Sequence, residues 1–193
     1  MSAKWVMLAL AFCGSVNATT VFGIKLGAPL AMRECSYSRI DASTVIFNPP
    51  NHGRCYQLTS TSGRTALRPN DNIFVNWVQT PAISTGSADV QLVGGKVEGI
   101  GVNTAGIETQ QVDLQSLISK FGKPSQLENV PMGNAMGATF KTVRARWLLV
   151  NGAHVTYLSA DNRIDRGLIS ISTPAGRAYT RAQLTKLNTG SGL

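Results

Sequence analysis

The stretch Lys141-Thr-Val-Arg-Ala-Arg-Trp-Leu-Leu-Val-Asn-Gly-Ala-His-Val-Thr-Tyr-Leu-Ser159 carries the strongest local structural signal in this sequence. Asn151-Gly152 lies between two segments rich in β-branched and aromatic residues. Asn-Gly is the dipeptide that two-residue type I′ turns prefer, because both turn residues need a positive φ. The stretch therefore predicts a β-hairpin with strands over residues 141–150 and 153–159.

The predicted turn also determines which residues face each other. A two-residue turn at Asn151-Gly152 places Arg146 opposite Tyr157, and residues two apart on a strand share a face. One face is apolar and is the expected core side, with Val143, Ala145, Trp147 and Leu149. Arg144 and Arg146 lie on the other face, where Arg146 and Tyr157 could form a cation–π pair.

Further strands are predicted on both sides of this hairpin. Residues 167–172 alternate in polarity and end at Thr173-Pro174, which is typical of a strand followed by a break. Earlier in the chain, residues 90–93 and 96–102 flank Gly94-Gly95 and predict a second tight hairpin.

One amphipathic helix is predicted over residues 110–121. Its apolar residues recur at helical spacing, Gly122 occupies the position of a C-cap, and Pro124 prevents continuation. The resulting order predicts an α+β fold, with an antiparallel sheet built from hairpins and one main helix packed on a face. We expect a single domain over residues 19–174, divided into an irregular, disulfide-tied part (19–80) and a ββαβββ part (88–174), with a flexible basic tail over 175–193.

The first eighteen residues have the features of a secretory signal peptide. Lys4 gives the positive start, residues 5–12 are apolar, and Val16-Asn17-Ala18 provides the small residues of a cleavage site. The apolar run is shorter than the roughly 20 residues that a spanning helix needs. We therefore expect a periplasmic or secreted protein that begins at Thr19, with no stable membrane insertion.

Cleavage at that site would remove Cys13 and leave two cysteines. An even pair in an oxidising compartment favours a disulfide, so we expect a Cys35–Cys55 bond. We also expect a short helix over residues 28–34 and a strand that begins at Cys55.

The helix end Lys120-Phe121-Gly122-Lys123-Pro124, followed by a linker and a Trp-bearing hairpin, resembles the small periplasmic domains of the β-lactamase-inhibitor-like group. The small lipoprotein of the outer-membrane barrel-assembly machinery shares that architecture. The start Phe22-Gly23-Ile24-Lys25-Leu26-Gly27 resembles uncharacterised exported proteins of Gram-negative bacteria. At the level of motifs, the match covers residues 90–172. It implies a binding or assembly role, and it identifies no functional residue in this chain.

The sequence contains no motif typical of catalysis or metal binding. The mature chain has two histidines, His52 and His154, without a third ligand at metal-binding spacing, and no serine lies in a nucleophile elbow. We therefore expect no enzyme activity and no cofactor or metal.

Charge gives the remaining clue. From Lys141 onward eight Lys and Arg residues face only Asp161 and Asp165, whereas the preceding mature residues are nearly neutral. This basic third either solubilises the protein or contacts an acidic surface. Export and the absence of aromatic residues among the basic ones disfavour nucleic acid.

We therefore expect a non-enzymatic periplasmic or secreted binding protein that contacts another protein, in an envelope assembly or transport system. An inhibitor or immunity protein of an exported enzyme, such as a lysozyme or protease, is the alternative. The predicted binding residues are Arg144, Arg146, Tyr157, Arg163 and Arg166.

Overall fold

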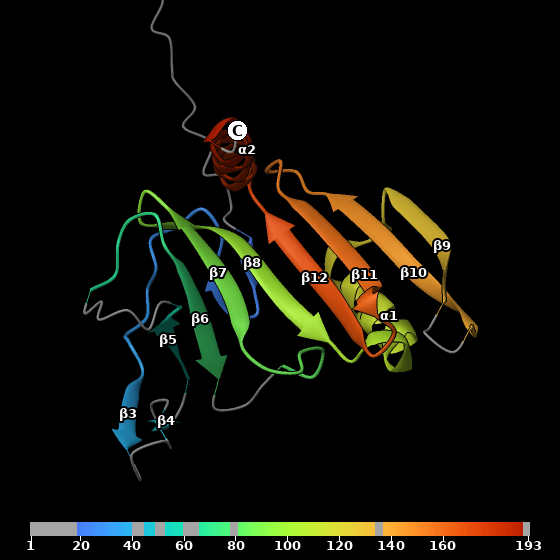
Figure 1. The fold of residues 1–193 in the computed structure, drawn as a ribbon, viewed down its shortest axis with the longest axis horizontal. Coiled ribbons are helices and arrows are strands. Elements are labelled where there is room, and N and C mark those ends of the chain that lie inside the picture. The colour runs from blue at the N-terminus through green and yellow to red at the C-terminus, as the bar shows by residue number, and fades with distance from the viewer. Residues whose placement is uncertain are drawn as a thin grey trace, which may run out of the picture.

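The computed structural model describes residues 19–39, 45–48, 53–59, 66–77, 81–133 and 137–190. These residues form an eight-stranded antiparallel sheet, two two-stranded sheets and two α-helices, which confirms the α+β class (Figure 1). In spatial order the large sheet contains β5 (Arg54–Leu58), β6 (Asn72–Trp77), β7 (Ala88–Val93), β8 (Lys96–Thr104), β12 (Arg166–Ser172), β11 (His154–Arg163), β10 (Thr139–Leu148) and β9 (Gln126–Gly133). The proposed signal peptide, residues 1–18, lies outside the described residues.

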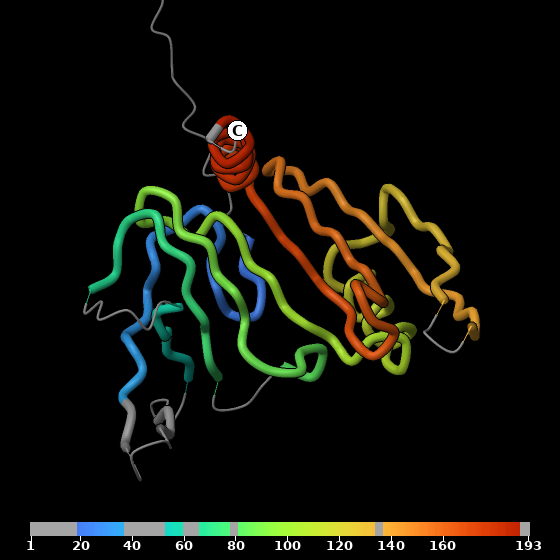
Figure 2. The backbone as a smooth tube through the Cα atoms, viewed as in Figure 1, coloured from blue at the N-terminus to red at the C-terminus, as the bar shows by residue number. Residues whose placement is uncertain are grey.

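The large sheet consists of two consecutive four-stranded meanders. β5 to β8 form the first and β9 to β12 the second, and the last strands of the two, β8 and β12, pair antiparallel. A short 3-10 turn (Gly106–Glu108) and the helix α1 (Gln110–Phe121) connect the meanders. The two halves thus share one continuous sheet, which can be followed along the backbone in Figure 2.

One face of this sheet carries the hydrophobic core. Over the first meander it is covered by the small hairpin of β1 (Thr20–Val21) and β2 (Ile24–Lys25), and over the second by α1. The main buried side chains are Val21, Ile24, Leu26, Ile73, Val75, Val90, Leu92, Val97, Ile100, Val102, Leu114, Leu117, Val143, Ala145, Trp147, Val155, Tyr157, Ile169 and Ile171. The predicted apolar face of the 141–150 strand is confirmed as core.

α1 has the bounds that the sequence predicts. Gly122 follows it with a φ of +79°, and its carbonyl oxygen accepts a hydrogen bond from Trp147 Nε1 at 2.8 Å. The helix also presents a buried carboxyl, Asp113, to the sheet. Its Oδ2 accepts a bond from Thr109 Oγ1 at 2.7 Å and lies 3.5 Å from the Tyr157 hydroxyl. Trp147 and Tyr157 therefore anchor α1 to β10 and β11.

The register predicted for the β10–β11 hairpin is wrong by one residue. Leu149 N donates to Ala153 O (2.9 Å) and Gly152 N donates to Leu149 O (2.8 Å), so the loop has three residues with the last in the left-handed region. The Asn151 side chain accepts a bond from Ala153 N and donates one to Thr19 Oγ1, which stabilises this loop. The extra residue places Arg146 opposite Thr156.

Three further predictions concern the N-terminal part. The Cys35–Cys55 disulfide is confirmed, and the strand at Cys55 is β5. The helix expected over 28–34 is wrong, because Cys35 N donates to Tyr56 O and Tyr56 N donates to Arg33 O, so residues 33–35 extend along β5. A two-stranded sheet, β3 (Ser36–Arg39) with β4 (Val45–Asn48), follows this segment.

The expectation of a flexible tail is also wrong for residues 175–190, and residues 191–193 lie outside the described part. Residues Pro174–Gly190 form the helix α2, which stands at one end of the sheet on the face opposite the core (Figure 1). Pro at the first helical position after a Thr cap favours helix initiation, because proline lacks only an N–H that would be unpaired there. Neither helix of the described part is long and apolar enough to span a membrane.

Candidate functional site

In the described part of the chain, most of the side chains on the face of the sheet opposite the core are half-buried or exposed, and α2 stands on this face at one end (Figure 1). This open face is the candidate site. The pairing registers align its side chains into rows that cross the strands. The first row, from β6 to β10, is Asn72, Gln91, Gly99, Ser172, His154 and Leu148. The second, from β6 to β9, is Phe74, Asp89, Gly101, Ser170, Thr156, Arg146 and Gln126.

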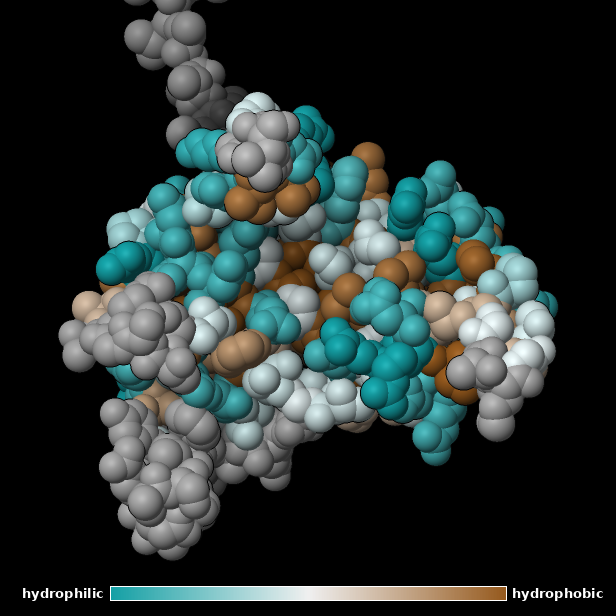
Figure 3. Space-filling view, viewed as in Figure 1, coloured by the Kyte–Doolittle hydropathy of each residue, from teal (hydrophilic) through white to brown (hydrophobic). Residues whose placement is uncertain are grey.

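Both rows have small residues in the middle and larger ones at the sides; most of the larger ones are polar or charged, and Leu148 and Phe74 are apolar. Gly99 and Gly101 lie on β8 and Ser170 and Ser172 on the adjacent β12, in the centre of the sheet. Glycine weakens a strand interior because it has no side chain to pack, and it often marks a place where another group approaches the backbone. The centre of the open face is therefore low, and hydrophobic residues are visible there between hydrophilic areas in Figure 3.

α2 forms a wall beside this low centre. Its N-terminus is fixed by Thr173, whose Oγ1 donates to the buried Glu98 carboxylate and accepts a bond from Gly176 N at 3.1 Å. Gly176 packs so closely on β8 that a methyl group there would overlap Glu98 O. Arg177 donates to Ser172 O (2.8 Å) and to Gly152 O (3.0 Å). These contacts hold the first turns of α2 on the sheet.

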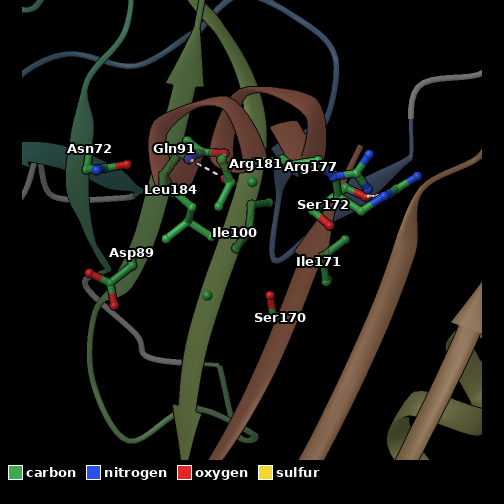
Figure 4. A pocket seen from close by; sticks show the side chains of 14 residues that line it. Asn72, Asp89, Gln91, Ile100, Ser170, Ile171, Ser172, Arg177, Arg181 and Leu184 are labelled. Atoms are coloured by element: carbon green, nitrogen blue, oxygen red, sulfur yellow. Dashed lines mark hydrogen bonds between the residues drawn. The ribbon is translucent and has the colours of Figure 1, made fainter. Parts of the chain in front are cut away.

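A groove of about 650 Å³ lies between α2 and the sheet. β6, β7, β8 and β12 provide its floor, and α2 contributes Arg177, Thr180, Arg181 and Leu184 (Figure 4). Gln91 Nε2 donates to Thr180 Oγ1 at 3.1 Å and joins the floor to the wall. Leu184 is 55% exposed although it lines the groove, so the wall carries both cations and an uncovered apolar side chain.

An acidic group lies on the side of the groove formed by β7. Burial raises the pKa of the Asp89 carboxyl, and the nearby positive charge of Arg166 partly offsets this rise. Asp89 is directly opposite Gly101. The groove thus has a carboxyl on one side and the guanidinium groups of α2 on the other.

A smaller pocket of about 320 Å³ lies on the same face over β9, β10 and β11. Its lining includes Ser125, Gln126, Arg146, His154 and Thr156. Arg146 Nη1 donates to Gln126 Oε1 at 3.3 Å. Burial and the positive charges of Arg177 and Arg146 lower the pKa of His154, so this end of the open face is electropositive.

The structure separates the predicted binding residues into three places. Arg144 and Arg146 share the open face as expected, and both are exposed. Tyr157 lies opposite Ala145 on the core face and is fully buried, so the expected Arg146–Tyr157 contact does not form. A one-residue change of register moves a side chain to the opposite face of the sheet, which explains the error.

Arg163 and Arg166 lie at the other end of β11 and β12. Arg163 forms two hydrogen bonds with the Asp165 carboxylate, at 2.9 and 2.5 Å, within the turn between these strands. These bonds lower the pKa of Asp165 and raise that of Arg163. Arg163 and Asp165 thus form a charge-paired turn, which lies away from Arg144 and Arg146.

Sequence reasoning missed the groove and the residues that α2 contributes. The signal that could have found α2 was Thr173-Pro174 as a helix cap, followed by a segment rich in helix-forming residues. The groove depends on strand pairings between residues far apart in the chain, such as Gly99 with Ser172. A local sequence pattern does not predict such pairings.

In the described part of the chain, His, Cys, Asp and Glu side chains form no group of three or more that could hold a metal ion. Comparison with known proteins gives no match to the chain among family models, curated proteins or solved structures.

Proposed function

We propose that this chain is a non-enzymatic binding protein that receives a segment of another protein on its open sheet face. The observation that carries the proposal is the groove of about 650 Å³, with its low floor and its wall of Arg177, Thr180, Arg181 and Leu184. Such a wall combines an exposed leucine with guanidinium groups, and arginine is one of the residue types that dominate interaction energies. An envelope assembly or transport system is the proposed setting.

The dimensions of the open face favour a protein segment as the ligand. The first row crosses six strands, and five strand spacings of about 4.8 Å give roughly 24 Å. That length matches about seven residues of extended chain. The groove and the electropositive pocket adjoin along this row, because His154 is opposite Ser172 and Ser172 is opposite Gly99.

Export through a cleaved signal peptide belongs to the same proposal. The Cys35–Cys55 disulfide supports an oxidising compartment, since disulfides persist mainly in exported proteins. Intact-mass measurement of the protein from a periplasmic fraction should give a chain that begins at Thr19. A mass that retains Met1, or one with a lipid on Cys13, would contradict this.

The binding proposal is tested by filling the groove. Gly101→Trp places a large side chain on the floor, whereas Val112→Trp adds the same side chain on α1, at a position that is 70% exposed on the other side of the sheet. The tagged mature variants are used to capture partners from envelope extract, with circular dichroism and thermal melting to show that they fold. We expect a protein that wild type and Val112→Trp retain and that Gly101→Trp loses. Equal capture by all three would exclude the groove.

The second candidate function is inhibition of an exported enzyme. The β10–β11 loop favours it, because Val150 is fully exposed at the tip and Leu148 is 64% exposed beside it. A protruding apolar loop suits insertion into an active-site cleft. Assays against exported lysozymes and proteases should show inhibition that Val150→Asp abolishes if this function holds, and no inhibition if the groove proposal alone is correct.

A further inference from the structure

The pocket over β9, β10 and β11 has the composition of an oxyanion site. Arg146, His154 and Thr156 are cross-strand neighbours or next neighbours on the open face, and Gln126 is opposite Arg146. Each can donate a hydrogen bond, and none of the side chains that line the pocket is a carboxylate. An anion that entered the pocket would meet donors from three strands.

The pocket is also held in place by its own contacts. Ser125 N and Ser125 Oγ both donate to Arg146 O, at 2.8 and 3.0 Å, and they fix the start of β9 against β10. The bond from Arg146 Nη1 to Gln126 Oε1 restrains the guanidinium. A planar guanidinium that is already restrained loses less entropy when it binds a carboxylate.

At this end of the open face the acidic residue of the edge strand is Glu128, which is opposite Arg144 and not opposite Arg146. Among the described residues, the ion pair within 4 Å joins Arg163 to Asp165, and no carboxylate lies at that distance from Arg146 or Arg177. Arg177 is bonded to two backbone carbonyl oxygens, which carry no net charge. Burial lowers the pKa of His154, and the positive charges of Arg177 and Arg146 lower it further.

We propose that this pocket binds a carboxylate group, the side chain of an Asp or Glu in the protein segment that the open face receives. The source of the carboxylate rests on the proposed function, whereas the binding site itself does not depend on it. A planar carboxylate suits a guanidinium because two parallel N–H···O bonds can form. The segment would lie with its acidic residue at Arg146 and its neighbouring residues over Ser172 and Gly99, towards Leu184.

The site is tested first with a small probe. Glutarate, and separately inorganic phosphate, is titrated into the mature protein while NMR follows the His154 imidazole signals and their pH dependence. Glutarate bound beside His154 stabilises the imidazolium, so the pKa of His154 should rise by about 0.5–1 unit at saturation. Arg146→Gln should weaken glutarate binding about tenfold, since bonds to charged groups are the strong ones. Lys141→Gln removes the same charge from the same strand outside the pocket and should leave binding unchanged.

Several results would overturn the site. They are an unchanged His154 pKa in glutarate, equal losses in Arg146→Gln and Lys141→Gln, and a response to phosphate without one to glutarate. The source of the carboxylate is tested separately by capture of the partner from envelope extract. Loss of capture in Arg146→Gln, with retention in Lys141→Gln, supports a partner carboxylate. Glutarate binding without any captured partner would contradict the proposed function alone, and capture that Arg146→Gln leaves intact would contradict the carboxylate inference alone.

Discussion

Replacing Gly101 by valine should stabilise the fold while it obstructs the groove. Gly101 lies in the interior of β8, and its φ is outside the positive range that disfavours side chains. A Cβ built there would lie 3.6 Å from Asp89 Cβ and 3.9 Å from Asp89 O, which is ordinary van der Waals contact. Valine prefers extended backbone, and glycine loses more conformational entropy on folding. We expect a gain of about 0.5–1 kcal/mol in the free energy of unfolding.

Gly99 is the matched comparison, two residues earlier on the same face. A Cβ at Gly99 would lie 3.2 Å from Gln91 Cβ and 3.3 Å from Gln91 Oε1, so Gln91 would have to move. That movement would disturb its bond to Thr180 on α2. Gly99→Val should therefore gain less stability than Gly101→Val, or lose some.

Urea unfolding of the mature protein measures both variants, and thermal melting gives a second reading. For a chain of this size the expected gain for Gly101→Val corresponds to a rise of about 1–4 °C in Tm. A loss of stability in Gly101→Val would show that the centre of the open face is closely packed, and would refute its description as an uncovered floor. A gain in stability with undiminished partner binding would refute the role of this floor as the binding site.

Three further predictions follow from the geometry. Reduction of Cys35–Cys55, or a Cys35→Ser/Cys55→Ser double variant, should cost about 3 kcal/mol of stability in urea unfolding, since the bond closes a loop of 20 residues; an unchanged midpoint would contradict this. Burial raises the pKa of Asp113 despite bonds from Thr109 and Tyr157, so its folded form keeps the proton to a higher pH than the unfolded chain, and its contribution to stability is lost as pH rises above about 4. The stability of Asp113→Asn relative to wild type should thus increase from pH 3.5 to 7, and a constant difference would disprove the shift. Arg144→Glu/Arg146→Glu should weaken binding of an acidic partner with little change in Tm, because both side chains are exposed; unchanged affinity would remove these arginines from the site.

Local patterns were sufficient to predict the parts of the fold that local chemistry determines. The helix 110–121, the Gly94-Gly95 hairpin and the apolar face of β10 were all predicted correctly, since each depends on periodicity or on a turn dipeptide. The error at Asn151-Gly152 shows the limit. The dipeptide correctly predicted a turn, but bonds from the Asn151 side chain, one of them to Thr19, accompany a three-residue loop instead of a two-residue one.

Other elements were missed because their stability comes from distant residues. β9 contains Pro131 and is mostly exposed, so it has neither the composition nor the alternation of a buried strand, and it is ordered by pairing along β10. α2 is held by Glu98, Ser172 and Gly152, which lie outside its own sequence.

The candidate site was likewise predictable from the sequence only in part. The shared face of Arg144 and Arg146 follows from the two-residue period of a strand and was predicted. The pocket that joins Arg146 to His154 and Gln126 needs the register of three strands. A one-residue error in that register was enough to place Tyr157 wrongly in the site.

Site-specific photocrosslinking tests the central claim, that the open face receives a protein segment, most directly. A photoreactive benzoylphenylalanine is introduced at Ser170, on the groove floor, and for comparison at Val112 on α1, and intact cells that export the protein are irradiated. We predict a light-dependent adduct with another protein from Ser170 and none of that mass from Val112. No adduct at Ser170, or the same adduct from both positions, would contradict the account.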